Sequence, residues 1–336
     1  MKKALLATVA AAALGFGGAA YASPVYLDNG VHFGVDNSTK TGVFDTLGIV
    51  STLATSIYVG TPIGATQNTN PAGVGYSTAV PNGTLIFAPG TQVIDTNDST
   101  TMNTYGFVPG GKTNLFGTDN AFNATYPVVP QGVNIDTLNT PSTGNGFSNG
   151  TGDDAWGAAT GRWGLTYTYT LSGVTTATGV NFTGGTIDIF YNGVTTASSD
   201  LQSIKVLEID VTGSNLQAPN LTVFGKVDKN FLSGASAFVQ NFWNLAQGGG
   251  TSFLSYLNGG SDIDFRMAIN VDPAMATLFD SWNATWVTND DRTPVVFRQS
   301  VTSGIAEFNV PEPATLALMG LALAGAGVVS RRRKQA

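Results

Sequence analysis

The feature that most restricts the fold is a series of short segments in which apolar side chains recur at every second position. The segment RWGLTYTYTL is the clearest example, and the residues on one side of it are Trp163, Leu165, Tyr167 and Tyr169. TIDIFYN, IKVLEIDV, NLTVFGKV and DIDFRMAINV read in the same way. This spacing is typical of β-strands with one buried face, and Asn-Gly and Pro-Gly turn pairs separate the segments. It predicts a mainly β, β-sandwich-like sheet domain, with a β-helix-like sheet fold as the alternative.

Two segments have helical spacing instead. GASAFVQNFWNLAQ places Phe238, Phe242 and Leu245 near positions i, i+4 and i+7. DPAMATLFDSW begins with Asp272 as a candidate N-cap and a proline at the first helical position. Residues from about 60 to 155 are dense in Gly, Pro, Asn and Thr. We therefore expect a few short helices against the sheet, and long Gly/Asn/Thr-rich loops.

The first 22 residues read as a signal peptide. Two lysines precede an apolar, alanine-rich stretch, and the sequence Ala-Tyr-Ala then fits the small-x-small rule of signal peptidase. The predicted cleavage lies between Ala22 and Ser23. A retained transmembrane helix is the alternative, but the apolar stretch is short for that role.

The last 27 residues read VPEPATLALMGLALAGAGVVSRRRKQA. Prolines 311 and 313 fix φ and favour an extended, accessible stretch. Residues 314–329 are apolar except for Thr315, and as a helix they would span about 24 Å. This predicts a C-terminal transmembrane helix, somewhat shorter than a ~30 Å hydrocarbon core. A basic end follows and would stay on the cytoplasmic side, and it consists of Arg331, Arg332, Arg333 and Lys334.

The ordered series of Pro311, Glu312 and Pro313, an apolar segment and a basic end resembles the PEP-CTERM sorting signal. The resemblance implies export and removal of the tail by an exosortase, in a bacterium that makes extracellular polysaccharide. The expected organisation is a signal peptide (1–22), a secreted mainly β domain (23–309) and a sorting signal (310–336). The helix would then hold the precursor in the inner membrane transiently. A permanent membrane anchor is the alternative.

Segments of the body, among them GTQVIDTND and KVLEIDVTGSN, are similar to flocculation-associated PEP-CTERM proteins. That similarity implies a protein of the extracellular matrix or cell surface that associates with exopolysaccharide and promotes flocculation or biofilm formation. The high content of Thr, Ser and Asn also makes the chain a candidate glycoprotein.

Charge and composition exclude several classes of function. Without the six cations of the two ends, nine cations remain against 22 acids, so the mature part has a net charge near −13 when Glu312 is counted. This disfavours nucleic acid and anionic lipid as partners but permits divalent cations. The chain has no cysteine and one histidine, His32. Disulfides, cysteine nucleophiles and Cys/His zinc sites are therefore excluded.

Acids clustered on predicted turns are candidate calcium ligands. They are Asp95, Asp98, Asp290 and Asp291, and solvated turns are the alternative reading. Trp156 and Trp163, in DDAWGAATGRWG, are candidate carbohydrate contacts, with core packing as the alternative. No cofactor other than calcium is expected.

We predict that the protein is not an enzyme. The strongest alternative is a secreted polysaccharide-modifying enzyme, because Asp262 and Asp264 would lie on one face of a strand. A glycosidase needs two carboxylates about 5 to 10 Å apart.

Overall fold

The fold is described from a computed structural model of the 336-residue chain. The structure describes residues 22–30, 39–41, 43–60, 78–79, 87–98, 101, 127–131, 141–142, 146–147, 164–177, 179–195, 198–217, 220–272, 284–288 and 294–310.

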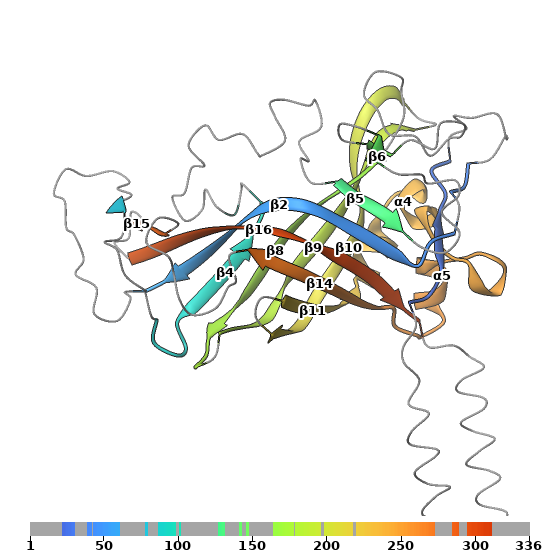
Figure 1. Cartoon of the computed structure of the whole chain (residues 1–336). Coiled ribbons are helices and arrows are strands. Elements are labelled where there is room, and N and C mark those ends of the chain that lie inside the picture. Colours follow the sequence, from blue (N-terminus) through green and yellow to red (C-terminus); the bar gives the residue numbers. More distant parts are fainter. Residues whose placement is uncertain are drawn as a thin grey trace, which may run out of the picture.

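Most of the described chain forms one antiparallel sheet of 11 strands (Figure 1). The strands are β2 (Thr46–Val59), β3 (Thr78–Ala79), β4 (Gln92–Thr96), β5 (Pro127–Gln131), β8 (Gly164–Thr175), β9 (Val180–Thr195), β10 (Ser198–Gln217), β11 (Asn220–Val227), β14 (Asp264–Asp272), β15 (Ala284–Thr288) and β16 (Pro294–Asn309). Their order is β3-β15-β16-β14-β11-β10-β9-β8-β4-β2-β5. The mainly β prediction is confirmed.

The sheet curls until it closes on itself. Strand β16 pairs with β14 on one side and with β2 on the other, so β2, β4, β8, β9, β10, β11, β14 and β16 form a ring. This differs from the predicted β-sandwich, in which two separate sheets pack face to face. Long strands with bulges allow a single sheet to bend in this way. β16 has such an irregularity in its pairing with β2, between Thr302 and Gly304.

The inner face of the curled sheet carries the core, and the predicted alternation produces it. Leu165, Tyr167 and Tyr169 in β8 are buried, as are Ile187 and Ile189 in β9. Asp188, between the two isoleucines, faces outward as the period-two pattern requires. The core therefore forms from residues that the sequence pattern had placed on one face.

Strand β10 breaks its predicted alternation. The pattern placed Val206 on the face opposite Leu207, but both side chains are fully buried. The register shows the reason, because Lys205 pairs with Phe190 while Leu207 pairs with Ile189. Val206 is thus the extra residue of a β-bulge. The bulge reverses the faces of the residues that follow it.

Short elements cover one end of the curled sheet (Figure 1). They are β1 (Val25–Leu27), α3 (Lys229–Gly234), α4 (Ala237–Phe242), β12 (Trp243–Leu245), η3 (Gln247–Gly249), β13 (Thr251–Ser252) and α5 (Phe253–Asn258). The strands β1, β12 and β13 make a three-stranded sheet. The predicted helix at 234–247 is α4, but it ends at Phe242 because the next three residues pair with β1. A further pair, β6 (Pro141–Ser142) and β7 (Gly146–Phe147), forms a separate two-stranded sheet.

An aromatic cluster joins these short elements to the sheet. Its centre is Trp243, whose ring lies 5.3 Å from Phe308 of β16 and 5.7 Å from Phe253 of α5, centroid to centroid. Phe44 and Phe242 complete the contacts around the indole. We call this region the capped end.

Within the described residues, no helix combines the length and the apolar character needed to cross a membrane. The predicted transmembrane helix at 314–329 and the predicted helix after Asp272 lie outside the described residues.

Candidate sorting junction and binding face

Hydrogen bonds join the two ends of the described chain through Ser23 and the residues at the end of β16. The Ser23 backbone N–H donates to the Phe308 carbonyl oxygen at 2.7 Å. The Ser23 hydroxyl oxygen accepts from the Val310 backbone N–H at 2.9 Å. Ser23 is only 4% exposed, and Val310 packs against the core. The predicted mature N-terminus therefore lies beside the residue that precedes Pro311.

The segment after Ser23 is fixed along its length. The Pro24 carbonyl oxygen accepts from the Ala246 N–H at 2.9 Å, and the Asp28 N–H donates to the Phe242 carbonyl oxygen at 2.8 Å. The Leu27 N–H donates to the Thr41 hydroxyl oxygen, also at 2.9 Å. This N-terminal segment is consequently part of the capped end and not a loose extension.

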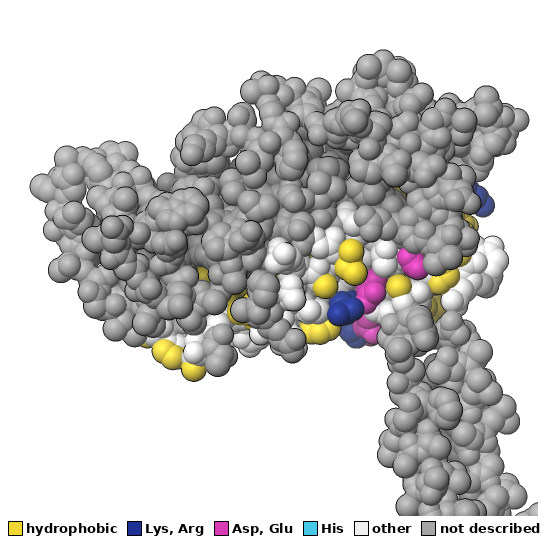
Figure 2. Space-filling view, viewed as in Figure 1, with side chains coloured by type: hydrophobic (Ala, Val, Ile, Leu, Met, Phe, Trp, Pro, Cys, Tyr) yellow, Lys and Arg dark blue, Asp and Glu magenta, His cyan; other side chains and the backbone are white. Residues whose placement is uncertain are grey.

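A second feature is the outer face of β11, β14 and β16, which we call the binding face. Across these strands, Phe224 lies opposite Arg266, and Arg266 lies opposite Glu307. Phe224 is 40% exposed, and on its other side lies Gly213 of β10, where a Cβ would meet open space. Figure 2 shows hydrophobic, basic and acidic side chains next to one another on the described part of this surface.

Neutral and apolar groups continue the binding face away from Phe224. In the next row Asn215 lies opposite Thr222, which lies opposite Ala268. Ala268 in turn lies opposite Ile305, which is also exposed. The exposed amides of Asn220 and Asn270 face each other one row further.

Two cations of the binding face whose side chains the structure describes, Lys226 and Arg266, are each paired with an acid. Arg266 Nη1 lies 2.8 Å from Glu307 Oε1. The Lys226 ammonium is paired with the Asp262 carboxylate. Asp264 lies opposite Lys226 in the sheet register. The two acids of the predicted enzyme site, Asp262 and Asp264, therefore lie on an open, exposed surface beside a lysine.

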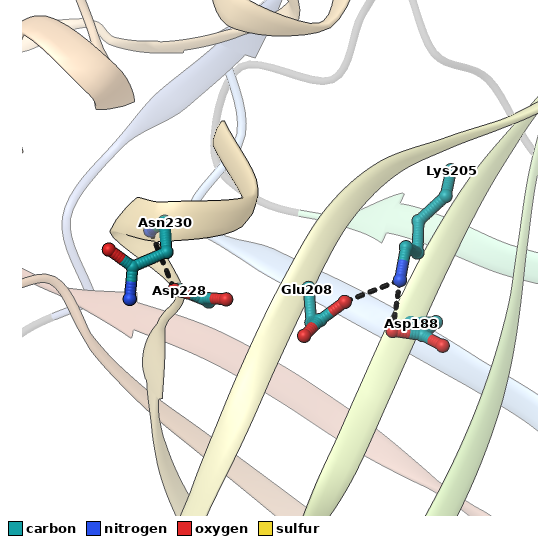
Figure 3. A network of polar contacts seen from close by, with 5 residues as sticks. All are labelled: Asp188, Lys205, Glu208, Asp228 and Asn230. Carbon is teal, nitrogen blue, oxygen red and sulfur yellow. Dashed lines mark hydrogen bonds and ion pairs between the residues drawn. The ribbon is translucent and has the colours of Figure 1, made fainter. Parts of the chain in front are cut away.

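An acidic network occupies the outer face of β9 and β10 (Figure 3). Lys205 bridges Glu208 and Asp188, with Nζ 3.5 Å from Asp188 Oδ1. Residues three apart on a regular strand point to opposite faces. The bulge at Val206 puts Lys205 and Glu208 on the same face, so this ion pair depends on it.

Burial and like charges shift the pKa values in this network. Burial raises the pKa of Asp188, and the charge of Lys205 only partly opposes the effect. Burial lowers the pKa of Lys205, but its hydrogen bond to Glu208 and the two acidic charges outweigh this and raise it overall. Burial also raises the pKa of Asp210, and the carboxylates of Asp228 and Glu208 raise it further.

Three of these acids come close enough to share a cation. One carboxylate oxygen from each of Glu208, Asp210 and Asp228 lies within 4.8 Å of the others. Asp228 is also the N-cap of α3, where it accepts from the Asn230 N–H at 2.7 Å. Oxygen ligands of this kind suit calcium or magnesium.

A comparison with known protein families confirms the sorting motif that was predicted at the C-terminal end. The family model described as PEP-CTERM protein-sorting motif matches residues 309–334. The chain carries a PEP-CTERM sorting motif. The motif implies export, processing by an exosortase and a location at the cell surface or outside the cell. No curated protein and no solved structure matches the chain.

The PEP-CTERM match starts at Asn309, the last residue of β16. The folded sheet and the sorting motif are therefore contiguous in the chain. The predicted motif and its basic end fall within the matched residues and outside the described ones, and they are Pro311, Glu312, Pro313, Arg331, Arg332, Arg333 and Lys334.

Two of the predicted calcium ligands are described: Asp95 lies within strand β4 and not on a turn, and Asp98 lies just after that strand. Asp95 is buried and accepts from the Ser56 hydroxyl at 2.6 Å and the Tyr169 hydroxyl at 2.7 Å. Asp98 accepts from both the backbone N–H and the hydroxyl of Thr101. Calcium binding by these residues stays a prediction. Asp290, Asp291, Trp156, Trp163 and His32 lie outside the described residues.

Sequence reasoning missed Phe224 and the acids of β10. In NLTVFGKV, Phe224 shares one face of the strand with the polar Thr222 and Lys226, opposite the buried Leu221 and Val223. An aromatic residue on the polar side of an alternating strand was the available signal. Glu208, Asp210 and Asp228 gave no comparable signal, because the sheet register brings them together.

Proposed function

We propose that the mature chain is a non-enzymatic protein of the extracellular matrix, which associates with exopolysaccharide and promotes flocculation or biofilm formation. The observation that carries the proposal is the sorting motif placed directly after a closed sheet domain. Such a domain presents a rigid outer surface outside the cell once the tail has been removed. The proposed function needs no cofactor.

The binding face supports a carbohydrate partner. The flat side of a sugar ring carries C–H groups that pack on the electron-rich face of an exposed aromatic ring such as Phe224. Neighbouring amides and hydroxyls, from Asn215, Asn220 and Thr222, can exchange hydrogen bonds with sugar hydroxyls. The open space over Gly213 leaves room for a sugar beside the phenyl ring.

The charges of the face favour a neutral polymer. Lys226 and Arg266 are each paired with a carboxylate, and the body of the chain is strongly acidic. An anionic polysaccharide would have to displace these acids and would be repelled at long range. We therefore propose a neutral polysaccharide as the partner.

The non-enzymatic reading is supported by the surroundings of Asp262 and Asp264. Both side chains are exposed on the outer face, and the Asp262 carboxylate forms an ion pair with Lys226. A general acid of a glycosidase works from an apolar, enclosed site.

The test is binding to neutral polysaccharide from the native matrix, measured by affinity electrophoresis. We expect Phe224→Ala to weaken binding about two- to tenfold, the range given by loss of one aromatic contact. Val174→Ala is the matched control, because Val174 is also 40% exposed but lies on β8. Equal binding by wild type and Phe224→Ala would contradict the assigned face.

The same polymer tests the enzymatic alternative. We expect no sugar release from wild type or from the double variant Asp262→Asn, Asp264→Asn. Release by wild type that disappears in the double variant would overturn the proposed function.

A further inference from the structure

We propose that Ser23 is a positioning residue for the sorting reaction, because it holds the start of the PEP-CTERM tail against the folded domain. We also infer that the Ala22–Ser23 bond is cut before the N-terminal segment docks. The inference rests on the proposed export and processing at both ends. We call the two hydrogen bonds between Ser23 and β16 the terminal clip.

The terminal clip joins residues 287 positions apart in the sequence. Ser23 binds β16 twice, through its backbone N–H to Phe308 and through its hydroxyl to Val310. Phe308 belongs to the aromatic cluster, with its ring 5.5 Å from that of Phe265. The clip is therefore attached to a strand whose end is packed into the aromatic cluster.

The clip fixes the point at which the tail leaves. Val310 is the only residue between the end of β16 and Pro311. Its N–H is held by Ser23 and its side chain packs against the core. An enzyme in the membrane thus receives a motif whose start is held by the fold, and such positioning speeds a reaction by reducing the orientations that must be searched.

Burial of the N-terminal segment sets the order of the two cuts. A protease binds residues on both sides of the bond as an extended, accessible strand. In the folded domain, Ser23 is buried and Val25 to Leu27 are paired with β12. Signal peptidase can therefore reach the Ala22–Ser23 bond only before the N-terminal segment packs against the domain.

Hydrolysis keeps the clip intact. Water adds across the Ala22–Ser23 peptide bond, which leaves a carboxylate on Ala22 and an α-ammonium on Ser23. The ammonium can still donate to the Phe308 carbonyl oxygen, now as a charge-assisted hydrogen bond. The hydroxyl that accepts from Val310 is unchanged.

The first experiment measures tail removal in cells as the fraction of chain that still carries the Arg331–Arg333 end. We expect Ser23→Ala to raise this fraction at least twofold, and Ser23→Thr, which keeps the hydroxyl, to restore it. Thr41→Ala is the matched control. It removes the hydroxyl that accepts from the Leu27 N–H of the same N-terminal segment, and it leaves the bond to Val310 intact. An unchanged fraction in Ser23→Ala, or an equal rise in Thr41→Ala, would overturn the positioning role.

Hydrogen exchange on the purified, tail-less domain tests the clip independently of sorting. Loss of one hydrogen bond should make the Val310 amide exchange about two- to tenfold faster in Ser23→Ala than in wild type. Equal rates would disprove the clip. Wild-type protein that keeps its tail in cells would instead contradict the proposed function.

The order of cuts is tested on the full-length precursor with purified signal peptidase in detergent. We expect the urea-unfolded chain, diluted into the assay, to be cut at least tenfold faster than the folded chain. Equal rates would show that docking does not protect the bond.

Discussion

The capped end and the outer face of β9 and β10 are built on the same sheet but held by different forces. At the capped end, large aromatic rings surround Trp243, and hydrogen bonds between uncharged groups hold the N-terminal segment in place. On the outer face, Lys205 forms ion pairs with both Asp188 and Glu208, and the carboxylates of Asp210 and Asp228 lie near Glu208. Buried aromatic surface stabilises a fold by several kcal/mol a residue, whereas partly exposed ion pairs contribute about 0 to 1 kcal/mol.

The difference teaches where this domain can tolerate change. It has no disulfide, so the capped end has to supply the packing that closes one end of the sheet. On the outer face, burial and, to a smaller extent, neighbouring carboxylates raise the pKa values of Asp188 and Asp210, so ionisation of these two acids is unfavourable there.

The largest expected effect is at the capped end. Trp243→Ala should destabilise the domain by about 3–5 kcal/mol, because Trp243 is 1% exposed and its removal leaves a cavity among four rings. Urea unfolding followed by circular dichroism measures this. Trp243→Phe, which keeps a ring, should cost clearly less. A loss below about 1 kcal/mol in Trp243→Ala would mean that the capped end is not the stabilising region.

A pair of glycine variants should give an intermediate effect and a null effect. In Gly304→Ala the new methyl group would overlap the Ala268 carbonyl oxygen of β14, which should cost about 1–3 kcal/mol. In Gly213→Ala the methyl group meets open space, so the change should stay within about 0.5 kcal/mol. Thermal unfolding of both proteins measures the contrast. Equal destabilisation would contradict the close approach of β14 and β16.

The smallest effect has the opposite sign. Asp210 has a folded-state pKa above its ordinary value of 3.8, so its ionisation costs stability. That cost appears as the pH rises from about 3.8 through the raised pKa, and it is present in full at pH 7. Asp210→Asn should therefore stabilise the domain at pH 7 by less than about 1 kcal/mol, because the side chain is exposed.

Unfolding of Asp210→Asn and wild type at pH 7 and pH 3 measures the difference, which should vanish at the lower pH. Asp262→Asn is the matched control, because it removes a partner of Lys226 and should slightly destabilise the domain. Destabilisation by Asp210→Asn at pH 7 would contradict the repulsion assigned to this cluster.

Much of the fold could be predicted because strand patterns are local. The alternation in β8 and β9 identified the buried Leu165, Tyr167 and Ile187 directly. The prediction failed in β10, where the bulge at Val206 reverses the faces of the residues up to a second irregularity between Val211 and Gly213. It was right about a helix at α4 but wrong after Phe242, where residues 243–245 form β12 and pair with β1. In both places a partner far away in the sequence overrides the local preference.

The candidate sites divide in the same way. The sorting motif was visible in the sequence because its three parts are consecutive, and the family match confirms it. The acidic group of Glu208, Asp210 and Asp228 was not visible, because it joins a strand to the start of a helix through the register of β10 and β11.

The sequence by itself determined that the chain is mainly β and that it ends in a PEP-CTERM sorting motif. Both follow from residues close together in the chain, through the period of two and the ordered tail. Only the tertiary structure decided that the sheet closes through β2 and β16, that Phe224 stands exposed beside Gly213, and that Ser23 meets Val310. These depend on strand register and bulges, which hydrogen bonding between distant segments sets and no local pattern records.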